Sequence, residues 1–294
     1  AGWRDAAGIV GTRSDGRISR MKPLQLSAAD EQMLAALGQY RLLTMQQIER
    51  LGIANRKHAG ERLKRLAAAG YVDSVRGSPM APGVFWLTLK AAKHFADVFA
   101  PEWAQSASAK GFSGSAHLGQ RVATVDVCIG LRAWAERTGY QVKTLRTDFD
   151  GGSADLKRAT SLTWNGVTYT ADALGELIDA SGAPWVIALE VETGGHGERL
   201  DNFQAKLQHR LDVISGRHID RAMNRPPGSR AARMLFVFKS AAMLGRALKS
   251  LPEPAAKHWQ AIFFAALPDV VENFGGPWLQ ATGERRNPFQ PVAS

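Results

Sequence analysis

Hydrophobic residues recur at helical spacing in three short segments near the amino terminus of the chain. Each segment begins at a residue whose side chain can cap a helix, namely Ser27, Thr44 and Asn55. Gly70 follows the third segment, at a position where glycine commonly ends a helix. Because the apolar positions repeat every three or four residues after each cap, the pattern predicts three short helices.

Two short apolar runs follow the third predicted helix. Residues 71–75 and 84–87 flank the turn-rich segment RGSPMAPG, which predicts a β-hairpin with a long tip. A further helix is expected over residues 88–99. Three helices followed by a hairpin are the parts of a winged helix-turn-helix, a fold whose third helix enters the major groove of DNA.

A second set of elements follows residues 101–115, where small and polar residues are typical of a linker. Helical spacing predicts a long helix over residues 116–138. The later patterns predict strands at 141–147, 161–164, 167–172, 184–192, 233–238 and 259–266, and helices at 198–215 and 240–250. Asn165-Gly166 is a strong signal for a two-residue hairpin turn. This order predicts a mixed sheet flanked by helices, and therefore an α+β fold.

These patterns divide the chain into five parts. We expect a flexible basic arm at 1–26, the winged helix at 27–100, the linker at 101–115, an α/β domain at 116–270 and a tail at 271–294.

The charge balance favours a polyanionic partner. Lys and Arg number 37 against 27 Asp and Glu, which gives a net charge of +10. Seven cationic side chains are the predicted DNA contacts: Arg56, Lys57, His58, Arg62, Lys64 and Arg65 on the third helix, and Arg76 in the hairpin. We therefore expect double-stranded DNA as the partner. The alternative is a basic helix face that is merely solvated.

The single cysteine, the short apolar runs and the positions of the tyrosines exclude several kinds of protein and site. Cys128 is the one cysteine, so a disulfide within the chain and a multi-cysteine zinc site are excluded, and core packing is its expected role. No apolar run has the length that a membrane span needs, so we expect a cytoplasmic protein without a membrane partner. The four tyrosines, among them Tyr169, lie in apolar patterns and are expected to pack, which leaves water as the nucleophile of any DNA cleavage.

The second part also contains a candidate catalytic site. Asp172 is expected at the end of the strand over 167–172, and Glu190 and Glu192 lie two residues apart on the next strand, so both glutamates point to one face. Lys206 lies on the helix that follows, and His196 lies in the turn between that strand and that helix. We interpret these five residues as candidate catalytic residues.

Carboxylates from adjacent strand ends can hold a hard cation, so Asp172 and Glu190 are the predicted ligands of Mg²⁺ or Mn²⁺. The Lys206 ammonium can orient or deprotonate water, or stabilise charge on a phosphate. The alternative is a pair of glutamates that faces solvent or an arginine. A strand as apolar as PWVIALEVE favours a site, because burying charge without a partner is costly. No nucleotide cofactor is expected, since no Walker or dinucleotide fingerprint is present.

A winged helix followed by YTADALGEL, WVIALEVETG and the pattern F-x-x-K-L-x-H resembles the replication-relaxation family, over about residues 27–240. Members of this family are plasmid-borne proteins linked to plasmid replication, DNA relaxation and mobilisation. The second part is similar to the PD-(D/E)XK restriction-endonuclease-like fold. The resemblance implies that Asp172 is the family's aspartate, Glu190 its strand acid and Lys206 its lysine.

Two positions depart from the nuclease pattern. Ala171 stands where that pattern has a proline, and Glu192 stands where it has a lysine. If Lys206, which lies on the helix after this strand, takes the role of the missing lysine, we expect the domain to keep nuclease activity. Without this replacement, the domain is a nuclease-like fold that only binds DNA.

We therefore expect a plasmid-type DNA-binding protein that acts in DNA relaxation, mobilisation or replication, with metal-dependent nicking as its candidate activity. The first alternative is a replication initiator, an accessory factor or a transcriptional regulator whose nuclease-like domain is inert. The second is an interaction protein whose α/β domain forms a homodimer or recruits relaxosome or replication proteins.

Overall fold

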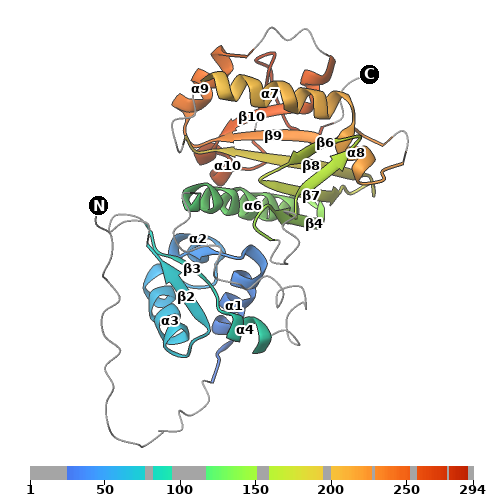
Figure 1. Ribbon diagram of the computed structural model, residues 1–294. Helices are drawn as coiled ribbons and strands as arrows, with labels where there is room; N and C mark the ends of the chain where they lie inside the picture. Colours follow the sequence, from blue (N-terminus) through green and yellow to red (C-terminus); the bar gives the residue numbers. More distant parts are fainter. Residues whose placement is uncertain are drawn as a thin grey trace, which may run out of the picture.

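The computed structural model describes residues 25–76, 82–94, 117–150, 159–194, 200–226, 229–251, 257–276 and 278–290 of the chain (Figure 1). The protein is an α+β protein with a mixed sheet, as the sequence predicts. An amino-terminal unit (residues 25–94) lies against one side of a long helix, α6, and the large sheet lies on the other side of this helix (Figure 1).

The amino-terminal unit begins with three capped helices. Their bounds are Ala28–Tyr40 for α1, Met45–Arg50 for α2 and Arg56–Ala68 for α3. Ser27 and Thr44 each form a reciprocal capping box with the residue three positions later, and the Asn55 side chain accepts a hydrogen bond from the His58 backbone N–H at 3.0 Å. The predicted caps are confirmed, because each depends only on residues within one turn.

A small antiparallel sheet completes this unit. It contains β1 (Leu43–Thr44), β2 (Val72–Val75) and β3 (Val84–Leu87) in the order β1-β3-β2. The sequence did not predict β1, since two residues are too short to form a pattern. The helix expected over 88–99 is α4 (Leu89–His94), and residues 95–100 lie outside the described residues.

The large sheet has seven strands in the order β12-β11-β10-β9-β8-β7-β4. Its members are β4 (Gln141–Thr147), β7 (Ala173–Ile178), β8 (Pro184–Glu192), β9 (Arg233–Phe238), β10 (Ile262–Ala266), β11 (Trp278–Gln280) and β12 (Arg285–Arg286). The strands β8, β9 and β10 are parallel, and the other neighbours are antiparallel. The helix α6 (Leu118–Thr138) covers one face together with α10 (Leu267–Glu272) (Figure 1).

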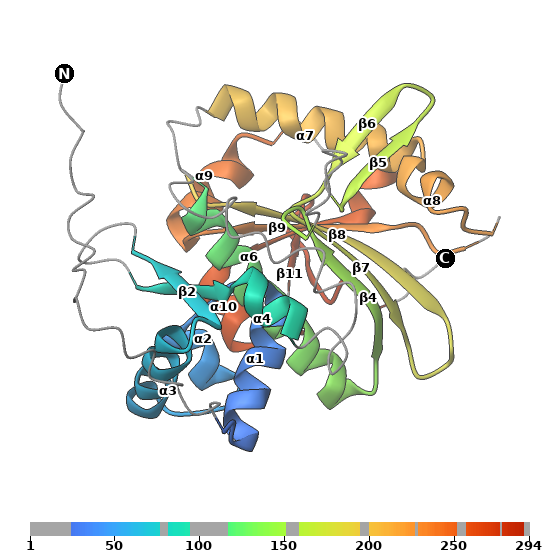
Figure 2. The ribbon, with the colours of Figure 1, turned by 60° about the horizontal axis from the view of Figure 1, so that its bottom comes forward.

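The opposite face of the sheet is covered by α7 (Leu200–Ser215) and α9 (Ala241–Lys249) (Figure 1). Strands β5 (Ser161–Trp164) and β6 (Val167–Thr170) form a separate hairpin, which lies beside the short helix α8 (His218–Ala222) (Figure 2). Asn165 and Gly166 form the expected two-residue turn at its tip, with φ values of 47° and 77°, which are the positive values that a type I′ turn requires.

The structure corrects three of the expected strand and domain boundaries. The strand expected over 167–172 ends at Thr170, and Asp172 instead lies directly before β7, a strand that the sequence did not predict. The strand expected over 259–266 begins only at Ile262, after a 3₁₀ turn. Much of the segment expected to be a tail, 271–294, belongs to the fold, because β11 and β12 extend the sheet there. The bounds of these strands follow from their pairing in the sheets, which the hydrophobic pattern of a short segment does not show.

The amino-terminal unit shares one continuous hydrophobic core with the α6 face of the large sheet. Polar contacts reinforce this docking. The Gln47 side-chain amide donates to the Val122 carbonyl at 3.0 Å, and the Arg50 guanidinium lies 2.5 Å from the Asp126 carboxylate. The position of α3 relative to the sheet is therefore fixed by packing.

Cys128 is buried in the core, as expected, and burial raises its thiol pKa to about 12. Among the described helices, none has the length and apolar character that crossing a membrane requires.

Candidate functional site

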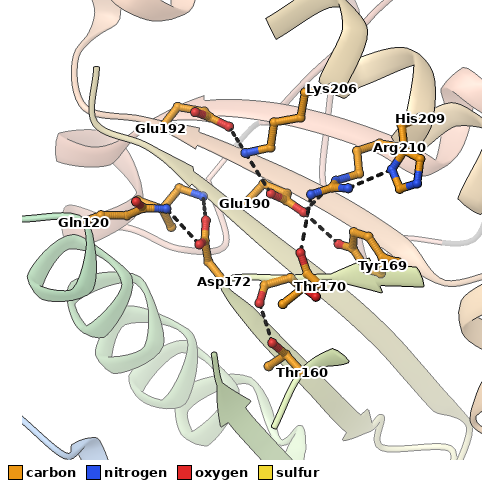
Figure 3. Close-up of polar contacts among 12 residues, drawn as sticks. Gln120, Thr160, Tyr169, Thr170, Asp172, Glu190, Glu192, Lys206, His209 and Arg210 are labelled. Atoms are coloured by element: carbon orange, nitrogen blue, oxygen red, sulfur yellow. Dashed lines mark hydrogen bonds and ion pairs between the residues drawn. The ribbon is translucent and has the colours of Figure 1, made fainter. Parts of the chain in front are cut away.

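The carboxyl end of β8 carries two buried glutamates (Figure 3). Glu190 and Glu192 are 1% and 5% exposed. Both point from the sheet toward α7, as their two-residue spacing predicts. Charged side chains are almost never buried this deeply without partners, so the partners of these two glutamates define the site.

The helix α7 supplies two cations to these glutamates. The Lys206 ammonium lies 3.0 Å from Glu190 Oε2 and also forms an ion pair with Glu192. One turn later, Arg210 Nε lies 2.9 Å from Glu190 Oε1. Residues four apart on a helix lie on one face, so the sequence spacing of these two cations brings both to the same carboxylate.

A tyrosine completes the shell around Glu190. The Tyr169 hydroxyl donates to Glu190 Oε1 at 3.0 Å, and the Arg210 guanidinium lies 4.5 Å from the centroid of the tyrosine ring. Burial and the neighbouring Glu190 carboxylate raise the Tyr169 pKa well above 10, so the hydroxyl remains a donor. The expectation that Tyr169 only packs therefore missed its hydrogen bond to Glu190.

Asp172 lies at the start of β7 and faces the same end of β8 (Figure 3). Its Oδ2 accepts the Val191 backbone N–H at 2.6 Å, and its Oδ1 accepts a hydrogen bond from the Gln120 side chain at 2.8 Å. Burial and the charge of Glu190 raise the Asp172 pKa to about 7, although Lys206 and the Val191 N–H act in the opposite direction. No sequence pattern predicted the contact with Gln120, which lies on α6, 52 residues before Asp172.

Lys206 is a permanent cation in this arrangement. Burial alone would lower the pKa of its ammonium, but the carboxylates of Glu190, Glu192 and Asp172 outweigh burial and raise it. This ammonium can donate hydrogen bonds and stabilise negative charge. The expectation that it could deprotonate water is not favoured, because the proton is held too tightly.

The donor set at this site fits a divalent cation only in part. Among the described residues, no group of three or more His, Cys, Asp or Glu side chains is arranged to hold a metal ion. Asp172 and Glu190 nevertheless repel each other, as the raised pKa of Asp172 indicates. Magnesium is often held by one or two carboxylates together with water and phosphate oxygens. These two residues could therefore serve as its protein ligands. The fifth candidate, His196, lies outside the described residues.

The second candidate surface is the outer face of α3. Ala59, Leu63 and Leu66 are buried against the amino-terminal unit. On the other face, Lys57 and Lys64 are exposed, and neither forms an ion pair with a described residue. Seven residues correspond to nearly two helical turns, so these two lysines lie on the same side of the helix.

The other predicted DNA contacts on α3 have partners of their own. Arg56 Nε lies 2.8 Å from Glu49, and the His58 ring lies 3.4 Å from Glu61, both at exposed positions. Arg76 is exposed at the end of β2. Exposed pairs of this kind contribute little stability and can exchange partners.

Arg62 and Arg65 instead clamp a buried carboxylate. Asp30 is 0% exposed and forms ion pairs with both arginines, with Arg62 at 3.1 Å. Burial alone would raise the Asp30 pKa, but hydrogen bonds from Ser27 and from the two arginines lower it to about 2. These two arginines therefore join α3 to the start of α1, a role that the sequence did not reveal.

Comparison with known proteins gives one match. The sequence model described as Replication-relaxation matches residues 34–224. No curated protein and no solved structure matches the chain. The matched segment contains α3, Asp172, Glu190 and Lys206, and thus both candidate surfaces.

Proposed function

This chain belongs to the replication-relaxation family, and from that premise we propose that it is a duplex-DNA-binding protein whose amino-terminal unit is a winged helix. Membership in the family points to a role related to plasmid replication or relaxation. The observation that carries the proposal is the outer face of α3, where Lys57 and Lys64 are exposed and form no ion pair with any carboxylate of the described residues. Such a helix can lie in the major groove while its other face stays packed.

The order of elements supports this assignment. A winged helix presents its third helix to the groove, and the hairpin beside it touches the DNA backbone. The β2–β3 hairpin, with exposed Arg76 at the end of β2, directly follows α3. In both ribbon views the hairpin lies on the same side of the molecule as α9, the helix after the carboxyl end of β9 (Figures 1 and 2). A bound duplex could therefore extend toward the carboxylate site.

Salt-dependent binding tests this proposal. We expect the variant that combines Lys57→Ala and Lys64→Ala to bind a duplex more weakly, with a plot of log affinity against log salt that is less steep by about 2. Fluorescence anisotropy with a labelled duplex at several salt concentrations gives both quantities. The matched control combines Arg137→Ala and Arg221→Ala, which removes two exposed charges from α6 and α8. Equal slopes for the two variants, or no binding at low salt, would contradict the proposal.

A second candidate function is nicking of the bound DNA at the carboxylate site. The meeting of Asp172, Glu190 and Lys206 at one strand end favours it. A divalent cation held by Asp172 and Glu190 would stabilise negative charge on the phosphate that is cleaved. Lys206 would donate a hydrogen bond to the same phosphate, while Tyr169 and Arg210 hold Glu190 in place. Water would be the nucleophile.

Supercoiled plasmid DNA provides the assay for nicking. With Mg²⁺ or Mn²⁺, we expect the wild type to convert supercoiled DNA to the open circle, and Asp172→Asn to lose this activity while retaining DNA binding. Asp212→Asn on the exposed side of α7 is the matched control and should behave as the wild type does. If the wild type binds DNA but does not nick it under any of these conditions, the α/β domain is inert and the protein acts as a binding factor.

A further inference from the structure

The basic helix α3 carries one carboxylate, Glu61. Three residues of α3 are buried against the amino-terminal unit: Ala59, Leu63 and Leu66. At about 100° per residue, Glu61 lies about 140–160° around the helix from each of them. Its side chain therefore points away from the packed face of α3, and 63% of this side chain is exposed. In a helix that lies in the major groove, such a position faces the edges of the base pairs.

The protein itself holds Glu61 only weakly. Within the described part of the chain, its ion pair is with His58 at 3.4 Å, and both side chains are exposed. Exposed pairs of this kind contribute little stability. The space beside Glu61 is open, because a hollow of about 260 Å³ is lined, among the described residues, by His58, Glu61, Arg62 and Arg65. The carboxylate is therefore accessible to a ligand that lies along the outer face of α3.

A carboxylate at this position opposes the binding of DNA in general. Its negative charge repels the phosphates of every duplex, whatever the sequence. An ionised carboxylate only accepts hydrogen bonds, so a donor on the edge of a base is what can offset this repulsion. The major groove presents two donors of this kind, the N4 amino group of cytosine and the N6 amino group of adenine.

We propose that Glu61 selects a C·G base pair by accepting a hydrogen bond from the N4 amino group of cytosine. Adenine fits less well, because its N7 acceptor lies beside its N6 amino group and repels the second oxygen of the carboxylate. Cytosine presents its amino group to the major groove without a neighbouring acceptor on the same base. This role of Glu61 rests on the proposed function, the binding of duplex DNA by α3, and adds to it a base pair that the helix selects.

Selection of binding sites from a pool of random-sequence duplexes tests this role. The wild type should enrich duplexes in which one position is C·G. Glu61→Gln keeps the shape of the side chain but adds an NH₂ donor, and glutamine can pair with both N6 and N7 of adenine. We therefore expect this variant to prefer A·T at that position and to keep the wild-type preference at the other positions. Glu61→Ala should lose the preference for C·G there.

Fluorescence anisotropy with labelled duplexes measures the size of the effect. Replacing the selected C·G pair should weaken binding of the wild type about tenfold, and binding of Glu61→Ala much less. On a duplex of unselected sequence, both variants should bind more tightly than the wild type, because a negative charge near the phosphates is removed. Glutamine and alanine are good helix formers, so both variants should fold. Glu136→Gln, at an exposed position on α6, removes the same charge and should behave as the wild type does.

The outcomes separate this role of Glu61 from DNA binding itself. If the wild type binds duplexes and Lys57→Ala with Lys64→Ala reduces the salt slope, but Glu61→Gln and Glu61→Ala select the same bases as the wild type, only the role of Glu61 is overturned. A wild type that selects no C·G pair overturns it as well. If both variants bind every duplex more weakly by the same factor, Glu61 stabilises α3 and reads no base. If the wild type binds no duplex at low salt, the proposed function fails too.

Discussion

Replacing Asp172 with asparagine should stabilise the folded protein at neutral and alkaline pH. Burial and Glu190 raise the Asp172 pKa from 3.8 to about 7. Folding therefore favours the protonated carboxyl, whose contribution to stability is present below about pH 4 and is lost as the pH rises through about 7. Above pH 7 the ionised carboxylate destabilises the folded state, and asparagine cannot ionise.

The magnitude follows from the difference between the two pKa values. About 3 pH units, at 1.36 kcal/mol each, give an upper limit of about 4 kcal/mol. Asp172 is only half-buried, so solvent screening reduces the expected gain to about 2 kcal/mol at pH 8. The asparagine oxygen can still accept the Val191 N–H, and a rotated Gln120 amide can accept its NH₂ group, so few hydrogen bonds are lost.

Urea denaturation at pH 4.5 and pH 8, in buffer with a chelator, measures this effect. The difference in free energy of unfolding between Asp172→Asn and the wild type should favour the variant more at pH 8 than at pH 4.5. Asp212→Asn, at an exposed position on α7, should follow the pH dependence of the wild type. The reasoning is refuted if Asp172→Asn is destabilised at pH 8, or if its advantage is the same at both pH values. A substitution that stabilises the fold while removing nicking would identify Asp172 as a residue kept for function.

Two further substitutions test the packing that positions the two surfaces. Asp30→Asn should lower the free energy of unfolding by about 2 kcal/mol at pH 7, because the Asp30 pKa is lowered to about 2 in the folded protein. Urea denaturation measures this loss, which should become smaller as the pH falls from 4 toward 2 and Asp30 becomes protonated. A smaller loss at pH 7 than at pH 3 would contradict this. Gly275→Ala should lower the free energy of unfolding by about 1–3 kcal/mol, because a Cβ there would lie 2.1 Å from Trp134 Nε1. The control is Gly245→Ala, which has open space at its Cβ and should not lower the unfolding midpoint in a thermal scan. Equal midpoints for the two alanine variants would exclude the predicted clash.

Much of the local structure could be read from the sequence, because its causes are local. The caps at Ser27, Thr44 and Asn55 act within one turn, and the structure confirms them. The strand PWVIALEVE is β8 with the predicted bounds, and its two-residue period places Glu190 and Glu192 on one face. The match of the family model to residues 34–224 confirms the suspected family.

The sequence predicted less well those strands that are very short or that contain a glycine. The strand β7 contains a glycine, and its antiparallel partners are β4 and β8. The strands β11 and β12 are only three and two residues long. Neither has a periodic pattern strong enough to be recognised, so the edge of the sheet was interpreted as a tail.

The sequence by itself determined the capped helices, the acidic strand end and the excess of positive charge, since these follow from residue type and from periods of two or 3.6 residues. Only the tertiary structure decided how each charge is used. It assigns Arg62 and Arg65 to Asp30, brings Gln120 to Asp172, and buries the Arg233 Nε without a hydrogen-bond partner among the described residues. The physical reason is that the pKa and the partners of a charged group depend on atoms within a few ångströms in space, and most of those atoms lie far away along the chain.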